Sequence, residues 1–357
     1  MTKRLYADIH ILQTVPPSCI NRDDTGSPKT AMYGGATRAR VSSQAWKKVV
    51  RDMFCDTIVK ENISVRTKRI QTMVADELKE LGYPEDMDEL AKKILKATGL
   101  QDKTYAGGKD APLFFISHTQ AKALAKLAME NPEPDKKAAQ NALNSAPGID
   151  LALFGRMVAD DANLNIDASC QVAHAISTHK VLNEYDYFTA VDDFPDAERT
   201  DAGAAMIGTV EYNSSTLYRF ATIAVHDLHN QLGNVEAAAN AVSVFVDAFA
   251  RSMPTGKINT FANRTLPSTL YIAIREDQPL NLVGAFERPI EANQRGYIEP
   301  SAKALVRSAN NAKTWIAQPK CSLALNDFMG DIDGVIILGT LGELLSRLKK
   351  EIGDDLA

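Results

Sequence analysis

The stretch that decides the fold runs from Ser18 to Lys48 and reads SCINRDDTGSPKTAMYGGATRARVSSQAWKK. An Asn-Arg-Asp-Asp loop and a Gly-Gly pair precede Ser42-Ser43-Gln44, which is typical of a helix start. From Ala36 to Arg51 there are five basic residues and no acid: Arg38, Arg40, Lys47, Lys48 and Arg51. Glycines allow close approach, helix N–H groups face an anion, and Arg and Lys supply positive charge. The stretch therefore predicts a surface that holds a phosphate backbone.

The charge distribution supports an anionic partner for the first part of the chain. The whole sequence holds 40 basic and 45 acidic residues. Residues 1–69 hold 13 Lys and Arg against 6 Asp and Glu, whereas the remainder holds 27 against 39. Such asymmetry indicates nucleic-acid binding, although a solvated basic surface would give the same composition.

Size and composition limit the class of protein. With 357 residues and 45% apolar content, the chain can form two units or one domain with a large insertion. No apolar run approaches the ~20 residues of a membrane span, and the first residues do not resemble a signal peptide. The four cysteines lie far apart in the sequence, and this spacing fits free thiols in a reducing cytosol. We therefore expect a cytoplasmic protein without membrane contact, bound metal or cofactor.

The periodicity predicts an α+β fold that begins with a half-buried strand. Leu5, Ala7, Ile9 and Ile11 alternate with polar residues, and 13–41 is expected to be a long loop. The helix that follows has Ser42 or Ser43 as its N-cap. Its predicted apolar stripe is Trp46, Val49, Val50 and Met53; its polar face is Gln44, Lys47, Lys48 and Arg51.

The order of the later elements predicts the topology. Residues 65–146 are helix-like and end at Pro147-Gly148. Strands are expected at 150–154, 208–225 and 268–274, and helices at 234–251, with Asn234 as N-cap, and 340–351. The core order is then β-α-β-β-α-β, as in a ferredoxin-like or RNA-recognition-motif domain, with a helical insertion after the first helix.

Catalytic motifs are not found. The sequence contains no phosphate-binding loop, dinucleotide fingerprint, zinc-protease helix or nucleophile elbow. The pairs His174/His179 and His226/His229 are better explained as ordinary histidines than as metal or acid–base sites. Turn formation and helix capping explain Asp23-Asp24, Asp160-Asp161 and Asp192-Asp193 more simply than phosphoryl-transfer chemistry does. The aromatic strand with which RNA-recognition domains stack bases is also missing, so any RNA should be held mainly by its backbone.

Six segments together carry a resemblance to a known family. They are SCINRDD, YGGATRARVSSQAWKK, GIDLALFGRM, VAHAISTH, DYFTAVDD and GTVEYNSSTLYRFA. In this order and spacing they resemble the CasC family, the backbone subunits of the type I-E CRISPR Cascade complex. The resemblance is dense over about 5–55 and 148–225 and looser elsewhere.

The resemblance implies a hand-shaped protein that resembles an RNA-recognition motif in its palm. The palm would comprise 1–55, 166–180 and 212–357; a helical fingers insertion would comprise 56–165, and a hairpin-like thumb 181–211. Copies would stack head to tail along the CRISPR RNA (crRNA), together with other Cascade subunits. The guide would pair with target DNA, and a separate helicase-nuclease would degrade it. Such subunits are not enzymes.

The resemblance also assigns residues by position. Arg22, Lys29, Ser42, Gln44, Lys47, Lys48 and Arg51 would hold crRNA phosphates. Met157 and Thr189 would flank a base kinked out of the guide, although core filling for Met157 and strand propensity for Thr189 remain alternatives. Lys136 and Lys137 match a helix that can contact target DNA. Because Gln140 and Leu143 occupy its next turn, that contact should be weak.

Two alternatives remain open from the residues. The first is a CRISPR repeat RNA endonuclease of the same broad RAMP superfamily, for which His10 on the first strand would be the candidate. The second is a cytosolic homo-oligomer that binds no nucleic acid.

Overall fold

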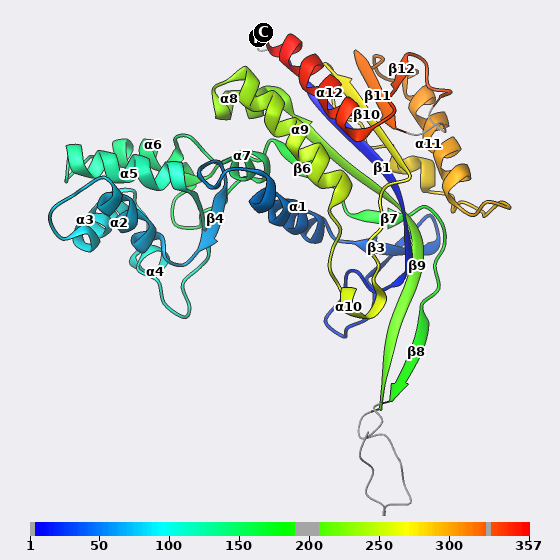
Figure 1. Ribbon diagram of the computed structural model, residues 1–357, viewed down its shortest axis with the longest axis horizontal. Coiled ribbons are helices and arrows are strands. Elements are labelled where there is room, and N and C mark those ends of the chain that lie inside the picture. The colour runs from blue at the N-terminus through cyan, green and yellow to red at the C-terminus, as the bar shows by residue number, and fades with distance from the viewer. Residues whose placement is uncertain (1–3, 190–206, 326–329) are drawn as a thin grey trace, which may run out of the picture.

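The computed structural model of the chain describes residues 4–189, 207–325 and 330–357. Within these ranges the fold is α+β, as predicted, with a ten-stranded sheet and a helical lobe beside it (Figure 1). The sheet order is β12-β11-β10-β1-β9-β7-β3-β2, and β6 and β8 also pair with β9. The strands are β1 Tyr6–Ser18, β2 Thr30–Tyr33, β3 Ala36–Val41, β4 Ser64–Thr67, β5 Phe114–Ser117, β6 Cys170–Val172, β7 Ala175–Ser177, β8 Glu184–Thr189, β9 Ile207–Ala224, β10 Thr269–Arg275, β11 Cys321–Leu325 and β12 Val335–Ile337.

The helices lie on the sheet or form the lobe. They are α1 Ser43–Thr57, α2 Ile70–Glu80, α3 Met87–Ala97, α4 Asp102–Tyr105, α5 His118–Glu130, α6 Lys136–Asn144, α7 Ile149–Phe154, α8 Val225–Leu232, α9 Val235–Arg251, α10 Ile258–Phe261, α11 Ile298–Ala312 and α12 Leu341–Leu356, with short 3-10 turns η1 Lys60–Asn62, η2 Ala162–Leu164 and η3 Leu282–Phe286. The predicted N-caps Ser42 and Asn234 are confirmed, because their side chains accept hydrogen bonds from backbone N–H groups of α1 and α9. The C-terminal helix begins after Thr340, which forms a capping box with Glu343.

β1 is the central strand, antiparallel to both β9 and β10. Ile9 and Ile11 point into the main core, which also contains apolar residues of α1, α9 and α12. The prediction of a half-buried strand is wrong, because Asp8 and His10 on the opposite face are buried as well. A second apolar cluster, formed with η3 and α11, covers that face.

The core elements β1, α1, β7, β9, α9 and β10 follow one another in the predicted β-α-β-β-α-β order. Within the sheet these strands are arranged β10-β1-β9-β7. Helices α1 and α9 pack on one face of the sheet, where the rings of Trp46 and Phe249 meet edge to face at 6.3 Å between centroids. Burial of this apolar stripe fixes the orientation of α1 and leaves its polar side outward.

Two predicted segments are wrong. Residues 13–41 are not a long loop, because β1 continues to Ser18 and β2 and β3 form a hairpin. Its turn uses Gly34 at φ 57°, where an added Cβ would lie 1.6 Å from the Glu287 carbonyl oxygen. Residues 150–154 form helix α7 and not a strand; a short apolar run cannot distinguish the two. The second core strand instead comes from β6 and β7, which pair with β9.

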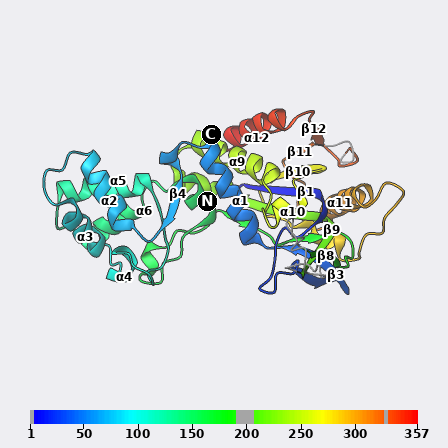
Figure 2. The same ribbon diagram turned by 60° about the horizontal axis from the view of Figure 1, so that its bottom comes forward.

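The helical lobe has an apolar core of its own. That core is built from residues between Ile70 and Leu164, which lie within the predicted insertion 56–165. The lobe also holds the two-stranded sheet of β4 and β5. Figure 2 shows the lobe set to one side of the main sheet, with α1 lying between them.

β8 and the first part of β9 form a hairpin that projects from the body of the protein (Figure 1). Every residue of β8 is exposed, including Tyr185, Tyr187 and Phe188. The hairpin lies within the predicted thumb at 181–211. The remainder of that prediction, residues 190–206 with Asp192-Asp193, lies outside the described residues.

Candidate nucleic-acid interface

The start of α1 is tied to the preceding loop. The Ser42 hydroxyl accepts from the Ala45 N–H at 3.3 Å, and the Ser42 N–H donates to Asn21 Oδ1 at 2.9 Å. The Lys29 N–H donates to the Asn21 carbonyl, and the Lys29 carbonyl accepts from the Arg40 N–H, both at 2.9 Å. These bonds bring the Arg22–Lys29 loop, β3 and the N-terminus of α1 together. Ser42 itself is buried, and its hydroxyl oxygen is engaged as the acceptor of the cap bond.

The polar face of α1 carries the accessible charge. Gln44 and Lys48 are exposed, whereas Lys47 is partly buried and lies 5.5 Å over the Phe154 ring. Lys48 pairs with Asp52 at 2.6 Å, but both side chains are more than half exposed. An exposed pair of this kind contributes only ~0–1 kcal/mol and can exchange for a phosphate. Arg22 and Lys29 add positive charge from the adjacent loop, and Arg22 is exposed.

Arg51 has a structural partner inside the protein. Its Nε donates to Asp150 Oδ2 at 3.0 Å, and its Nη2 donates to the Ser64 carbonyl at 3.3 Å. Asp150 is 2% exposed and also accepts from the Ser64 N–H. The prediction of Arg51 as a free phosphate ligand therefore needs correction: the guanidinium joins α1 to α7 and β4.

Arg66 of β4 is a basic residue that sequence reasoning missed. It is exposed and lies over the same Phe115 ring as Arg51, at 5.0 and 4.5 Å from the centroid respectively. Burial and the charge of Arg51 lower the pKa of Arg66. Residues 65–146 were expected to be helical, so no sequence signal placed Arg66 on a strand beside α1.

Arg38 and Arg40 have different surroundings, although both lie on β3. The prediction that Arg38 holds a phosphate is wrong, because its side chain is 0% exposed. Its guanidinium donates to the carbonyls of Tyr33, Ser177, Phe286 and Glu287. Arg40 is partly exposed; its Nε donates to the Thr30 carbonyl, and its Nη1 lies 3.2 Å from His174 Nδ1. Arg40 therefore remains in the candidate interface, and Arg38 does not.

Met157 and Thr189 are both at the surface. Met157, in the connection after α7, is 91% exposed, so core filling does not explain it. Thr189 is the exposed last residue of β8 and pairs with Ile207 of β9. Helix α7 and the end of β8 lie on different parts of the molecule (Figure 1).

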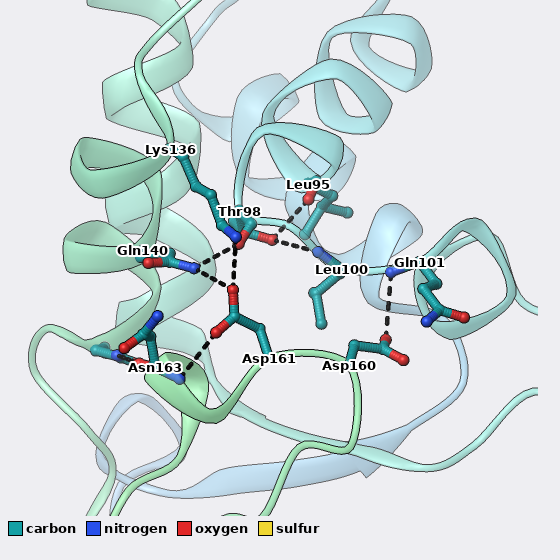
Figure 3. Close-up of polar contacts among 10 residues, drawn as sticks. Leu95, Thr98, Leu100, Gln101, Lys136, Gln140, Asp160, Asp161 and Asn163 are labelled. Carbon is teal, nitrogen blue, oxygen red and sulfur yellow. Dashed lines mark hydrogen bonds and ion pairs between the residues drawn. The ribbon is translucent and has the colours of Figure 1, made fainter.

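Lys136 and Lys137 begin α6, and only one of them has an acidic partner that the structure describes. Lys136 Nζ lies 2.7 Å from Asp161 Oδ2, which also accepts from Gln140 Nε2 at 2.9 Å (Figure 3). The bond from Lys136 is the main cause that lowers the pKa of Asp161 to about 2. Lys137 is exposed. A DNA contact by Lys136 would therefore have to replace an existing ion pair.

One member of each of two acidic pairs acts as predicted: Asp161 caps a helical turn, and Asp23 shapes a turn. Asp161 Oδ1 accepts from the Asn163 N–H at the start of η2, and Asp160 Oδ2 accepts from the Gln101 N–H (Figure 3). Asp160 Oδ2 also accepts from Thr104 Oγ1, so it ties its loop to α4. Asp23 Oδ1 accepts from the N–H groups of Thr25 and Ser27. These carboxylates shape loops.

A family model matches residues 7–330, which is most of the chain. The chain belongs to the family of CT1975-like proteins. It is similar to a chain of a "CRISPR RNA-guided surveillance complex, pre-nicking", with 29% identity, a TM-score of 0.81, and coverage of 97% of this chain and 100% of the other. It is also similar to a chain of another "CRISPR RNA-guided surveillance complex", with 26% identity, a TM-score of 0.71, and coverage of 97% and 99%. No curated protein sequence matches it.

The histidines of this CT1975-like protein are mostly engaged with protein atoms. His10 is 1% exposed, and its Nδ1 lies 2.9 Å from the Tyr218 hydroxyl. His179 stacks on the Tyr297 ring at 3.6 Å, and His226 Nδ1 contacts the backbone of Leu5. The described cysteines are free thiols, as predicted. Among the described helices, none is long and apolar enough to cross a membrane.

Proposed function

We propose that this CT1975-like protein is a non-catalytic crRNA-binding backbone subunit of a CRISPR surveillance complex of type I-E, acting in antiviral defence. The observation that carries the proposal is the match over the full length of a surveillance-complex chain, with a TM-score of 0.81. The basic start of α1 gives that match a physical role, because it offers exposed charge and helix N–H groups at one place.

In this proposal the protein holds RNA by its backbone. Gln44, Lys47 and Lys48 of α1 contact phosphates, together with Arg22 and Lys29 of the loop and Arg40 of β3. Such contacts position the strand without reading its sequence. Specificity then belongs to base pairing between guide and target DNA, as in other RNA-guided complexes.

Assembly in this proposal is head to tail along the guide. The exposed hairpin of β8 and β9 reaches the next copy, and Thr189 of one copy meets Met157 of another around a displaced base. This supposes contact between copies, because α7 and the end of β8 lie apart within one chain (Figure 1). A head-to-tail interface propagates instead of closing as a dimer. Other Cascade subunits complete the cytoplasmic complex, and a separate helicase-nuclease degrades the target.

The endonuclease alternative is disfavoured by the position of its candidate residue. Burial and the charge of Arg275 lower the pKa of His10 to about 3, so the imidazole is neutral and away from solvent. A general acid or base must reach the atom whose proton it transfers. His10 is enclosed by the rings of Tyr218, Phe220 and Tyr271.

Co-expression with a CRISPR array tests the proposal. We expect the purified protein to carry guide-length RNA, with a high 260/280 nm absorbance ratio, and not to cleave repeat RNA with or without Mg²⁺. If the protein purified without RNA from cells that contain the processed guide, RNA binding would be contradicted. Cleavage that is lost in H10Q would instead support the endonuclease.

A further inference from the structure

His174 lies in the connection between β6 and β7, beside the proposed RNA surface. Arg40 is paired with Ile176, and Val41 with Ala175, so the β3–β7 register brings the Arg40 side chain to the exposed ring of His174. Arg40 Nη1 and His174 Nδ1 are 3.2 Å apart. A guanidinium has only donors, so Nδ1 must accept. The ring is therefore neutral in this arrangement, with its hydrogen on Nε2.

The surroundings of His174 are positive. Burial is the main cause that lowers its pKa, and the charges of Arg40 from β3 and Lys29 from the loop before β2 lower it further. Both charges come from neighbouring segments, because β6 and β7 themselves hold no acidic or basic residue. Arg40 and the exposed His174 thus meet at the surface, and the charge of Lys29 acts on the same ring. In the free protein, proximity to two cations disfavours a third positive charge.

We propose that His174 is a further phosphate contact for the RNA of the proposed function, and that it takes up one proton when a phosphodiester binds beside Arg40. Protonation at Nδ1 ends the Arg40–His174 hydrogen bond, because both groups then only donate. Arg40 and the imidazolium can instead donate to the same phosphodiester, whose negative charge replaces the repulsion with attraction. The proton comes from water. This inference rests on the proposed RNA binding.

The consequence is that RNA binds more tightly as the pH falls. In the free protein His174 stays neutral until the pH is below its ordinary pKa of 6.5. The bound phosphodiester raises the pKa of the ring, so binding takes up a proton in the interval between the two pKa values. Each unit by which binding raises the pKa corresponds to about tenfold in affinity across that interval.

The test measures binding of a short fluorescein-labelled single-stranded RNA to the full chain at pH 8, 7 and 6, at constant ionic strength. We expect wild-type affinity to rise several-fold from pH 8 to pH 6, and this rise to be lost in H174Q. The matched control is H229Q on α8, which should keep the wild-type dependence. In protein labelled with ¹³C-histidine, the NMR titration of His174 should move to a higher pKa when RNA is present.

An equal pH dependence in wild type and H174Q, or a pKa of His174 that RNA leaves unchanged, would overturn this inference alone. If the wild-type chain bound no RNA at pH 8, 7 and 6 alike, the proposed function would be overturned as well. The two failures are therefore distinguishable.

Discussion

Arg51 and Asp150 form an ion pair, 3.0 Å from Nε to Oδ2, that joins the helix on the main sheet to the base of the helical lobe. The carboxylate is almost fully buried and the guanidinium is about one fifth exposed. Asp150 also accepts from the Ser64 N–H at 2.8 Å, so it links three segments of the chain.

Replacing Asp150 by Asn should destabilise the fold, because Arg51 keeps its charge without a partner. We expect a loss of roughly 2–4 kcal/mol in the free energy of unfolding, measured in urea. The control is D52N, which removes the exposed Lys48–Asp52 pair and should change it by less than ~1 kcal/mol. Equal effects of the two variants would contradict a structural role for the Arg51–Asp150 pair.

Asp8 and His10 should give the stability of the protein two opposing pH dependences. Burial raises the pKa of Asp8 to about 6 and lowers that of His10 to about 3. The stability that Asp8 contributes through its raised pKa is fully present below pH 3.8 and is lost as the pH rises through about 6. The His10 contribution is fully present above pH 6.5 and is lost as the pH falls toward about 3.

Variants separate the two contributions. Between pH 6.5 and 5, the free energy of unfolding of H10Q should rise relative to wild type as the pH falls, and that of D8N should fall. Each difference should reach roughly 1–2 kcal/mol over this interval. Urea titrations at several pH values measure these differences in the free energy of unfolding. If the differences for H10Q and D8N changed with pH in the same direction, the opposing pH dependences of Asp8 and His10 would be wrong.

Lys47 and Lys48 should contact phosphates and not bases. The double variant K47A/K48A should weaken binding about equally for unrelated RNA sequences. It should also lower the salt slope by ~0.7 per lost contact with single-stranded RNA. K122A/K126A, which removes two exposed lysines of α5 in the helical lobe, is the matched control. A loss that depends on sequence, with an unchanged salt slope, would argue for base contacts instead.

Met157 and Thr189 should hold one nucleotide per subunit out of the stack. The variant M157G/T189G should still fold, because both side chains are exposed, and should still assemble on RNA, because it keeps the phosphate contacts of α1. Target binding by the wild-type complex should tolerate mismatches at regular intervals, and the variant should lose that periodicity. A tiled set of single mismatches measures this. Uniform sensitivity in the wild type would exclude the role proposed for these residues.

The sequence predicted those parts of the fold whose signals are local. Ser42 and Asn234 marked helix starts, because a side-chain oxygen that precedes an apolar stripe is a nearby and specific signal. The hairpin of β2 and β3 was missed although its Gly34-Gly35 turn is a local signal, because 13–41 was interpreted as one loop. The burial of Arg38 on β3 was missed because its partners include carbonyls as distant as Phe286. Helix α7 was mistaken for a strand because a run of five residues has no decisive period.

The candidate site was predicted by residue type better than by accessibility. Gln44 and Lys48 are exposed as expected, whereas Arg38 is buried in the protein. Arg66 comes beside Arg51 over the Phe115 ring, and His174 comes beside Arg40 through the pairing of β3 with β7. A linear pattern of basic residues cannot show which of them the fold uses for itself.

Native mass spectrometry of the full chain, assembled on single-stranded guide RNAs of increasing length, distinguishes head-to-tail assembly from a closed oligomer. We expect the number of chains per RNA to rise in regular steps as the RNA lengthens. A fixed dimer whose mass is the same with and without RNA would contradict it.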